Sequence, residues 1–236
     1  MKTNASRLAP LGLALLAAPS FAEVSGTIAL SSDYDFRGIT QSAGDPALSG
    51  SIDWSTDPGL YLGAWASNVD FGPGTDTDVE IDLYGGFRGS ITEDLGFDVG
   101  AIYYLYQPGG DDVDFAEVYG SLSYKIFSAK LWYAWDFSNT GDSATYLEAN
   151  AGIPLPEEFS LNLHAGYSDG DYWDAGPDGS YFDWSIGVSR DFGNFALSLK
   201  YIDGSDLKSA DGTPGDVFSS ESKVWFSVST TLPWGD

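Results

Sequence analysis

The sequence contains no cysteine in its 236 residues, so the fold cannot depend on the disulfide bonds that hold many small exported domains together. Basic residues are also scarce. Ten Lys and Arg stand against 35 Asp and Glu, which gives a formal net charge of −25 at pH 7. Proteins that bind nucleic acids use basic side chains to neutralise phosphates, so this acidity argues against a nucleic-acid partner. High acidity can also indicate disorder, but 8 Trp, 14 Tyr and 14 Phe indicate a folded chain.

The apolar run at residues 8–19 is shorter than the roughly 20 residues that a membrane-spanning helix needs. It follows Lys2 and Arg7 and is followed by Ser20-Phe21-Ala22. A basic region, a short apolar region and small residues are typical of a secretory signal peptide. We therefore predict that residues 1–22 are a signal peptide cleaved after Ala22 and that residues 23–236 form one domain.

A helical period is missing after residue 22, whereas apolar and polar residues alternate almost throughout, as they do in β-strands. The alternation predicts about twelve strands, most of them with the ~9–11 residues that a tilted membrane-crossing strand requires. The apolar faces expected for the first, third and seventh strands include, respectively, Val24, Ile28, Leu30, Tyr34 and Phe36; Tyr61, Trp65 and Val69; and Leu131, Tyr133, Trp135 and Phe137.

The predicted connections alternate between short turns and longer loops that are rich in Gly, Pro, Asp and Asn. The longer loops cover roughly 38–46, 70–78, 107–114, 138–143, 168–180 and 203–222. Outer-membrane barrels have short periplasmic turns and long extracellular loops. The pattern therefore predicts an all-β fold, a transmembrane up-and-down antiparallel β-barrel in the outer membrane of a Gram-negative bacterium. A soluble β-sandwich also alternates, but it does not account for the regular switch in loop length.

The segment SSDYDFRGITQS at residues 31–42 alternates charged and aromatic side chains. In a membrane barrel one face of a strand meets lipid and the other meets water or a polar interior. We therefore expect Tyr34 and Phe36 to lie at the outer headgroup level, where aromatic rings are favoured, and Asp33, Asp35 and Arg37 to point inward.

Several stretches of residues 23–135 carry a family resemblance: SSDYDFRGITQSAGDPALSGSIDWS, GLYLGAWASNVDF, VEIDLYGGFRG, DVGAIYYLYQPG and FAEVYGSLSY. The most specific part runs from Asp33 to Gly38, with Gln41 and Pro46. This half of the chain resembles the TorF-type porins, a proteobacterial outer-membrane family of poorly defined function. The resemblance implies a porin-like barrel. Many barrels end on an aromatic residue that serves the assembly machinery, and here Trp234 stands two residues before the end.

The candidate selectivity residues are charged side chains whose position in the alternation points them into the lumen. They are Asp33, Asp35, Arg37, Asp53, Glu80, Asp82, Arg88, Asp98, Glu117, Asp136, Glu148 and Asp183. They could create a lumen that favours cations, or they could pair across strands as a structural network. Arg37 and Arg88 could form a constriction or neutralise nearby carboxylates. Tyr84, Tyr104, Tyr106, Trp132 and Trp225 also have inward parity and could fill part of the lumen.

Two other kinds of site are weaker candidates. The single histidine, His164, stands near Asn162 and Ser160, residue types that some hydrolases combine, but these side chains would face the lumen rather than lipid. The Asp-rich loops at 168–180 and 203–216 offer oxygen ligands, but neither has a complete calcium-loop spacing. We therefore predict no catalytic residues, no metal site and no cofactor.

The sequence thus predicts a porin for passive diffusion of small solutes, with a preference for cations. The alternative is a closed barrel with a structural, adhesive or carbohydrate-binding role carried by its acidic extracellular loops. The expected partners are outer-membrane lipid and lipopolysaccharide, small solutes or cations, and the barrel-assembly machinery.

Overall fold

The computed structural model describes residues 23–176, 178–205, 207 and 216–234. The predicted signal peptide, residues 1–22, lies outside this part of the chain. Within the described residues, no helix is long and apolar enough to cross a membrane.

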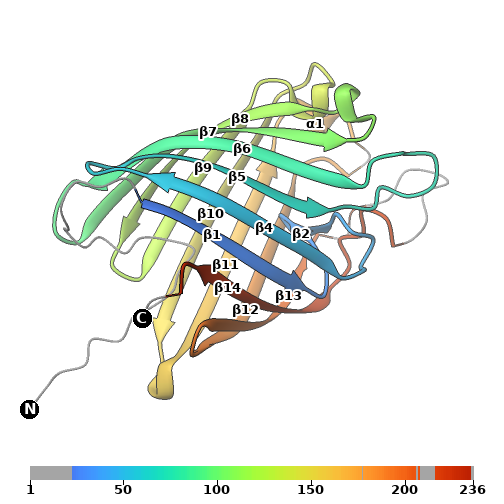
Figure 1. Cartoon of the computed structure of the whole chain (residues 1–236). Helices are drawn as coiled ribbons and strands as arrows, with labels where there is room; N and C mark the ends of the chain where they lie inside the picture. Colours follow the sequence, from blue (N-terminus) through green and yellow to red (C-terminus); the bar gives the residue numbers. More distant parts are fainter. Residues whose placement is uncertain (1–22, 177, 206, 208–215, 235–236) are drawn as a thin grey trace, which may run out of the picture.

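Twelve antiparallel strands of the described chain close into a barrel, which confirms the predicted fold and strand number. Each strand pairs with its neighbours in sequence, and β1 pairs with both β4 and β14 to close the ring. Figure 1 shows the strands running obliquely around the barrel. Their bounds are β1 (Glu23–Ser31), β4 (Ala47–Ser55), β5 (Leu60–Asn68), β6 (Val79–Ser90), β7 (Leu95–Gln107), β8 (Phe115–Tyr124), β9 (Phe127–Ala134), β10 (Ala144–Pro154), β11 (Phe159–Asp169), β12 (Tyr181–Phe192), β13 (Phe195–Gly204) and β14 (Lys223–Leu232).

The two ends of the barrel differ, as the loop lengths predict. One end, here called the turn end, carries the start of β1, the end of β14 and short connections such as 56–59, 125–126 and 193–194. The other, the loop end, carries longer connections at 32–46, 69–78, 108–114, 135–143, 170–180 and 205–222. Short helical turns occur in these connections: η1 (Gly110–Asp112), η2 (Phe137–Asn139) and α1 (Asp171–Asp174) at the loop end, and η3 (Pro156–Glu158) at the turn end.

The outer surface is apolar in the middle and aromatic toward both ends. Leu48 and Ile52 are each 60% exposed, far more than a water-soluble core face would allow. Exposed aromatic rings gather near the turn end, at Phe87, Tyr124, Phe127, Phe192 and Phe195, and near the loop end, at Tyr103, Trp135, Tyr167, Phe182 and Trp184. An apolar band between two aromatic girdles is the surface that a bilayer covers.

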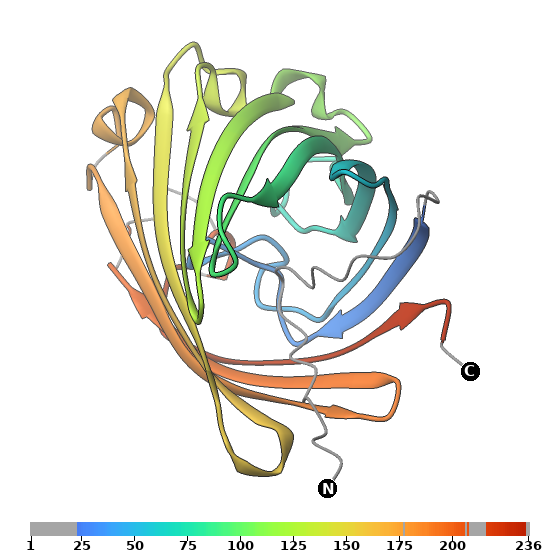
Figure 2. The same ribbon diagram turned by 90° about the vertical axis from the view of Figure 1, so that its left-hand side faces the viewer.

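The first strand ends earlier than the sequence predicts. β1 ends at Ser31, and residues 32–46 then fold back inside the barrel as a small hairpin of β2 (Asp35–Phe36) and β3 (Ile39–Thr40). Figure 2 shows this blue segment within the ring of strands. We call residues 32–46 the lumenal hairpin. The predicted headgroup position of Tyr34 and Phe36 is therefore wrong, because both side chains leave the wall together with the backbone that carries them.

The face assigned to the third predicted strand is also wrong. Trp65 of β5 pairs with Ser51 of β4 and Asp82 of β6, and all three point inward. Tyr61 is therefore lumenal as well, whereas Leu60 and Leu62 are the exposed apolar side chains of this strand. Val69 lies beyond the end of β5 and is buried.

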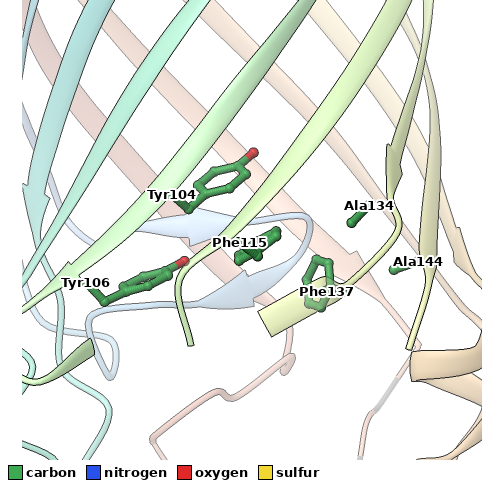
Figure 3. Packing of buried hydrophobic residues seen from close by; sticks show 6 residues of the cluster. All are labelled: Tyr104, Tyr106, Phe115, Ala134, Phe137 and Ala144. Carbon is green, nitrogen blue, oxygen red and sulfur yellow. The ribbon is translucent and has the colours of Figure 1, made fainter. Parts of the chain in front are cut away.

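β9 ends at Ala134, so Phe137 does not continue its outward face as the alternation predicts. Phe137 lies in η2 and belongs to a buried loop-end cluster, formed by Tyr104, Tyr106, Phe115, Ala134, Phe137 and Ala144. Figure 3 shows the Phe137 ring beside Phe115. The centroids of the two rings are 4.6 Å apart. The same early ending moves Asp136 from the predicted wall position into the loop, where its Oδ1 accepts a hydrogen bond from Gly141 N.

The lipid-facing surface can be tested with a charge at mid-strand. Leu83 of β6 is 49% exposed on the outer face, so Leu83→Arg should lower the free energy of unfolding by roughly 2–4 kcal/mol. The measurement is a urea titration of the barrel folded into lipid vesicles. Ser198→Arg, at an inward position of β13, is the control and should cost much less. Equal losses in the two variants would contradict a hydrocarbon environment for the outer face.

Candidate functional site

The lumenal hairpin turns at Gly38, which the sequence places directly after Arg37. Gly38 has φ +83°, a left-handed conformation that favours glycine, and its N–H donates to Asp35 Oδ2 at 3.2 Å. A Cβ at this position would lie 2.7 Å from the Cβ of Asp183 on β12. Glycine therefore allows both the turn and the close approach of the hairpin to the wall.

Arg37 attaches the hairpin to β8. Its two terminal nitrogens donate to the two carboxylate oxygens of Glu117 at 3.0 and 2.6 Å, a bidentate pair in which both side chains are buried. The guanidinium carbon lies 4.6 Å from the ring centroid of Phe36 and 4.5 Å from that of Tyr146. Tyr104 Oη donates to Glu117 at 2.8 Å, so this carboxylate has partners from the hairpin and from β7.

The last strand holds the opposite side of the hairpin. Lys223 Nζ of β14 lies 2.5 Å from Asp33 Oδ2 and 2.8 Å from Asp35 Oδ1, and Trp225 Nε1 donates to the Asp33 carbonyl at 2.7 Å. In the ring of twelve strands, β8 and β14 are six positions apart. The hairpin therefore bridges the lumen from one wall to the opposite one.

Further contacts fix the two flanks of the hairpin. Tyr34 Oη donates to Glu80 Oε1 of β6 at 2.7 Å, and the Tyr34 ring lies 5.2 Å from that of Trp65. Thr40 N donates to the Ser219 carbonyl at 3.0 Å, which connects β3 to the last loop. Because wall strands and a loop all contribute partners, the hairpin is fixed inside the barrel rather than being a free loop.

The carboxylates of the inner wall take most of their hydrogen bonds from uncharged donors. Tyrosine hydroxyls donate to Asp53 (from Tyr84, 2.5 Å), Asp98 (from Tyr61, 2.6 Å) and Asp183 (from Tyr146, 3.0 Å), and the Trp132 indole donates to Glu148 at 3.0 Å. Asp82 stands beside Glu80 in the same buried region, and its Oδ1 has no hydrogen-bond partner among the described residues. Among the described residues, the lumenal ion pairs made by Arg or Lys are those of Arg37 with Glu117 and of Lys223 with Asp33 and Asp35.

The remaining inward bases rest on aromatic rings. Lys130 Nζ lies 3.6 Å from the Tyr119 ring centroid and 3.8 Å from that of Trp132, and Lys200 Nζ lies 4.7 Å from the ring of Trp225. The Arg88 guanidinium lies 5.1 Å from the Tyr61 ring. No close ion pair joins these three cations to a carboxylate among the described residues, although Lys130 stands directly across the sheet from Glu148 and Arg88 from Asp98. They therefore offset part of the charge of the acidic wall without bonding to it.

His164 contacts polar residues of the inner wall rather than the candidate partners Ser160 and Asn162. Its Nε2 lies 2.8 Å from Asp183 Oδ1, and its Nδ1 lies 2.8 Å from Asn150 Oδ1. Ser160 is four residues away along the same extended strand, roughly 13 Å, and Asn162 donates to Ser189 Oγ instead. The hydrolase-like set is therefore not assembled.

Within the described residues, no group of three or more His, Cys, Asp or Glu could hold a metal ion. Residues 206 and 208–215, which include much of the Asp-rich loop 203–216, lie outside the described part of the chain.

The tyrosine donors and the hairpin are the functional features that the sequence prediction missed. Inward parity was predicted for Tyr84 and Tyr104, but as filling of the lumen rather than as hydrogen-bond donors to carboxylates. The signal for the hairpin was Gly38, whose place after an Asp-Phe-Arg run allows a tight turn.

The Arg37–Glu117 pair should control how often the hairpin opens. Arg37→Gln leaves Glu117 buried without its charged partner, a change that typically costs about 3 kcal/mol or more, so the amides of residues 39–42 should exchange roughly a hundredfold faster. Hydrogen exchange followed by mass spectrometry measures this rate. Arg37→Gln with Glu117→Gln removes both charges and should recover much of the protection. Unchanged exchange in Arg37→Gln would show that the pair does not hold the hairpin.

Gly38 and Gly44 provide a matched test of how tightly the hairpin fits. Both have positive φ, but a Cβ at Gly44 meets nothing within 4 Å, whereas a Cβ at Gly38 meets Asp183. Both Ala variants carry backbone strain, so Gly38→Ala should speed proteolysis within residues 32–46 well beyond Gly44→Ala. Equal proteolysis rates would mean that the hairpin does not pack against β12 in the folded protein.

Comparison with known proteins agrees with this architecture. A family model described as a bacterial protein of unknown function (Gcw_chp) matches residues 16–232. No curated protein matches the sequence at a significant level.

Among solved structures, the NanC porin superposes with a TM-score of 0.56 at 7% identity, covering 89% of this chain and 98% of that one. The KdgM porin superposes with a TM-score of 0.53 at 7% identity, covering 91% of this chain and 100% of that one. At such low identity these similarities show only the fold, a closed antiparallel β-barrel like that of these two porins. The family match spans nearly the whole barrel, and the chain therefore belongs to the Gcw_chp family of bacterial proteins.

Proposed function

We propose that the protein is an outer-membrane porin that admits small solutes by passive diffusion and favours cations and neutral solutes over anions. The loop end would face the outside of a Gram-negative cell. The observation that supports this proposal most is the chemistry of the inner wall. Asp53, Asp98 and Asp183 take hydrogen bonds from tyrosine hydroxyls, which stabilise a carboxylate without adding positive charge.

The mouth of the barrel supports the same preference. Apart from Arg37 in the lumenal hairpin, the described residues of the loop-end connections carry no Lys or Arg, whereas acidic residues such as Asp70, Asp114 and Asp171 recur there. A vestibule lined by one sign of charge concentrates counter-ions and lowers their entry barrier. Cations would therefore be enriched at the entrance before they meet the wall.

The lumenal hairpin is the proposed constriction of this channel. It bridges opposite walls and is attached to them by the ion pairs of Arg37 and Lys223. One solved KdgM structure is described as a complex with disordered oligogalacturonate, an acidic sugar chain. An acidic lumen disfavours such anions, so we infer a different solute class for this chain. The TorF-type assignment stays a prediction.

A closed barrel that acts through its loops is the second candidate. The extent of the hairpin contacts and the aromatic packing of the loop-end cluster favour it. The two candidates differ in one property, because a closed barrel conducts no ions.

Planar-bilayer recording under a KCl gradient tests the proposal. The dilute side should become positive at zero current, because K⁺ permeates more readily than Cl⁻. Asp98→Asn should reduce this reversal potential, since it removes a lumenal charge. Glu93→Gln removes one charge from an exposed turn and should leave the potential unchanged. Anion preference in the native protein would refute the electrostatic part, and the absence of conductance would favour the closed barrel.

A further inference from the structure

Arg190 is placed unlike the other basic side chains of the described barrel wall. On β12 it shares a face with Ile186, Val188 and Phe192, all of which are exposed on the outer surface. It pairs across the sheet with Phe159 of β11 and Leu197 of β13. The other described strand bases lie at inward positions: Arg88, Lys130, Lys200 and Lys223. Arg190 is therefore the base that the barrel turns toward the bilayer.

Aromatic rings, rather than acceptors, surround this guanidinium in the described part of the chain. Its carbon lies 4.9 Å from the ring centroid of Phe159 and 4.6 Å from that of Phe192, so it is held between two aromatic side chains. Its Nε is buried and has no hydrogen-bond partner among the described residues. An unpaired guanidinium donor at an apolar surface is costly, and a guanidinium fork matches the geometry of carboxylates and phosphates. The two terminal nitrogens of the guanidinium are not buried in this way, so an acceptor from outside the chain can reach them and offset part of this cost.

A groove leads away from Arg190 along the outer surface. It is lined by Phe159, Val188, Phe192, Leu197, Leu199 and Phe226 around the guanidinium. A second hollow shares Val188 and Leu199 and continues past Leu161 and Ile186 toward mid-barrel. The continuous surface is thus cationic at one end and apolar along the rest, which matches a molecule with an anionic head and a hydrocarbon tail.

The depth of Arg190 fits the headgroup region of a bilayer. β12 ends at Phe192, two residues later, so Arg190 lies within roughly 10 Å of the turn end. Phe195 and Trp234, whose rings are 6.4 Å apart, mark the aromatic girdle at this end. Phosphate groups lie just outside the hydrocarbon core, at the level where such girdles occur.

We propose that Arg190 and this groove form a binding site for a glycerophospholipid of the turn-end leaflet. The guanidinium donates to the lipid phosphate. One acyl chain lies in the groove, which extends over the outer face of β11, β12, β13 and β14. The net charge of −25 gives the protein no general attraction for anionic lipids, so the site depends on local complementarity. The proposal rests on the proposed membrane location of the barrel and is independent of whether the barrel conducts.

Native mass spectrometry of the detergent-solubilised full chain tests the site, with palmitoyl-oleoyl phosphatidylglycerol as the probe. Arg190→Gln should weaken binding at least about tenfold, the effect of losing a charge-assisted hydrogen bond. Arg190→Lys keeps the charge without the planar fork and should bind with intermediate affinity. Lys125→Gln, in an exposed turn at the same end, is the matched control and should bind like the native protein. Heat-modifiable electrophoretic migration confirms that each variant is folded.

Competitors identify which part of the lipid is recognised. A diacylglycerol with the same chains and inorganic phosphate should each compete poorly, because each supplies half of the ligand. Equal binding by native protein and Arg190→Gln would overturn the proposal. So would competition by diacylglycerol, or by millimolar phosphate, that is as strong as that of the phospholipid. A barrel that binds the lipid but conducts no ions would refute the porin proposal and leave this site standing.

Discussion

The structure depends on one constraint, which is that a sheet surrounded by hydrocarbon must satisfy all of its backbone hydrogen bonds internally. β1 meets this constraint by pairing with β4 on one side and β14 on the other, so the described ring of strands has no open edge. Once the ring is closed, each strand has one face toward lipid and one toward the interior. The apolar outer band, the aromatic girdles and the polar lumen all follow from that division.

The interior then has to hold many carboxylates in a confined space. Tyrosine suits this task because its ring fills volume while its hydroxyl donates to a carboxylate several residues or strands away. Neighbouring glycines make room for the rings: a Cβ at Gly86 would lie 2.5 Å from the Tyr61 hydroxyl. The wall is thus packed and hydrogen-bonded while it stays acidic. Two of the few basic residues, Arg37 of the hairpin and Lys223 of β14, form the ion pairs that attach the hairpin to the wall.

Local pattern in the sequence was sufficient for the barrel and for most faces. The alternation of apolar and polar residues, the strand lengths and the alternation of short and long connections predict the fold. They also place Glu117, Asp98 and Glu148 correctly on the inward face. The same alternation failed at Tyr34 and Phe36, because parity describes faces of a strand and cannot show that the chain has left the wall. It failed at Tyr61 and Trp65 because the face of β5 is set by register with β4, a non-local property. Arg190 could have been found, since its parity with Ile186 and Val188 is visible in the sequence.

The attachment of the lumenal hairpin to β14 has a consequence for assembly. Asp33 and Lys223 are 190 residues apart in the sequence. The hairpin also forms hydrogen bonds with Trp225 and Ser219, which lie near the end of the chain. The hairpin appears early in synthesis, but this part of its binding surface is absent until the final strand has been delivered. The hairpin is consequently fully attached only when the barrel closes, because Lys223 and Trp225 of β14 supply its contacts at Asp33 and Asp35.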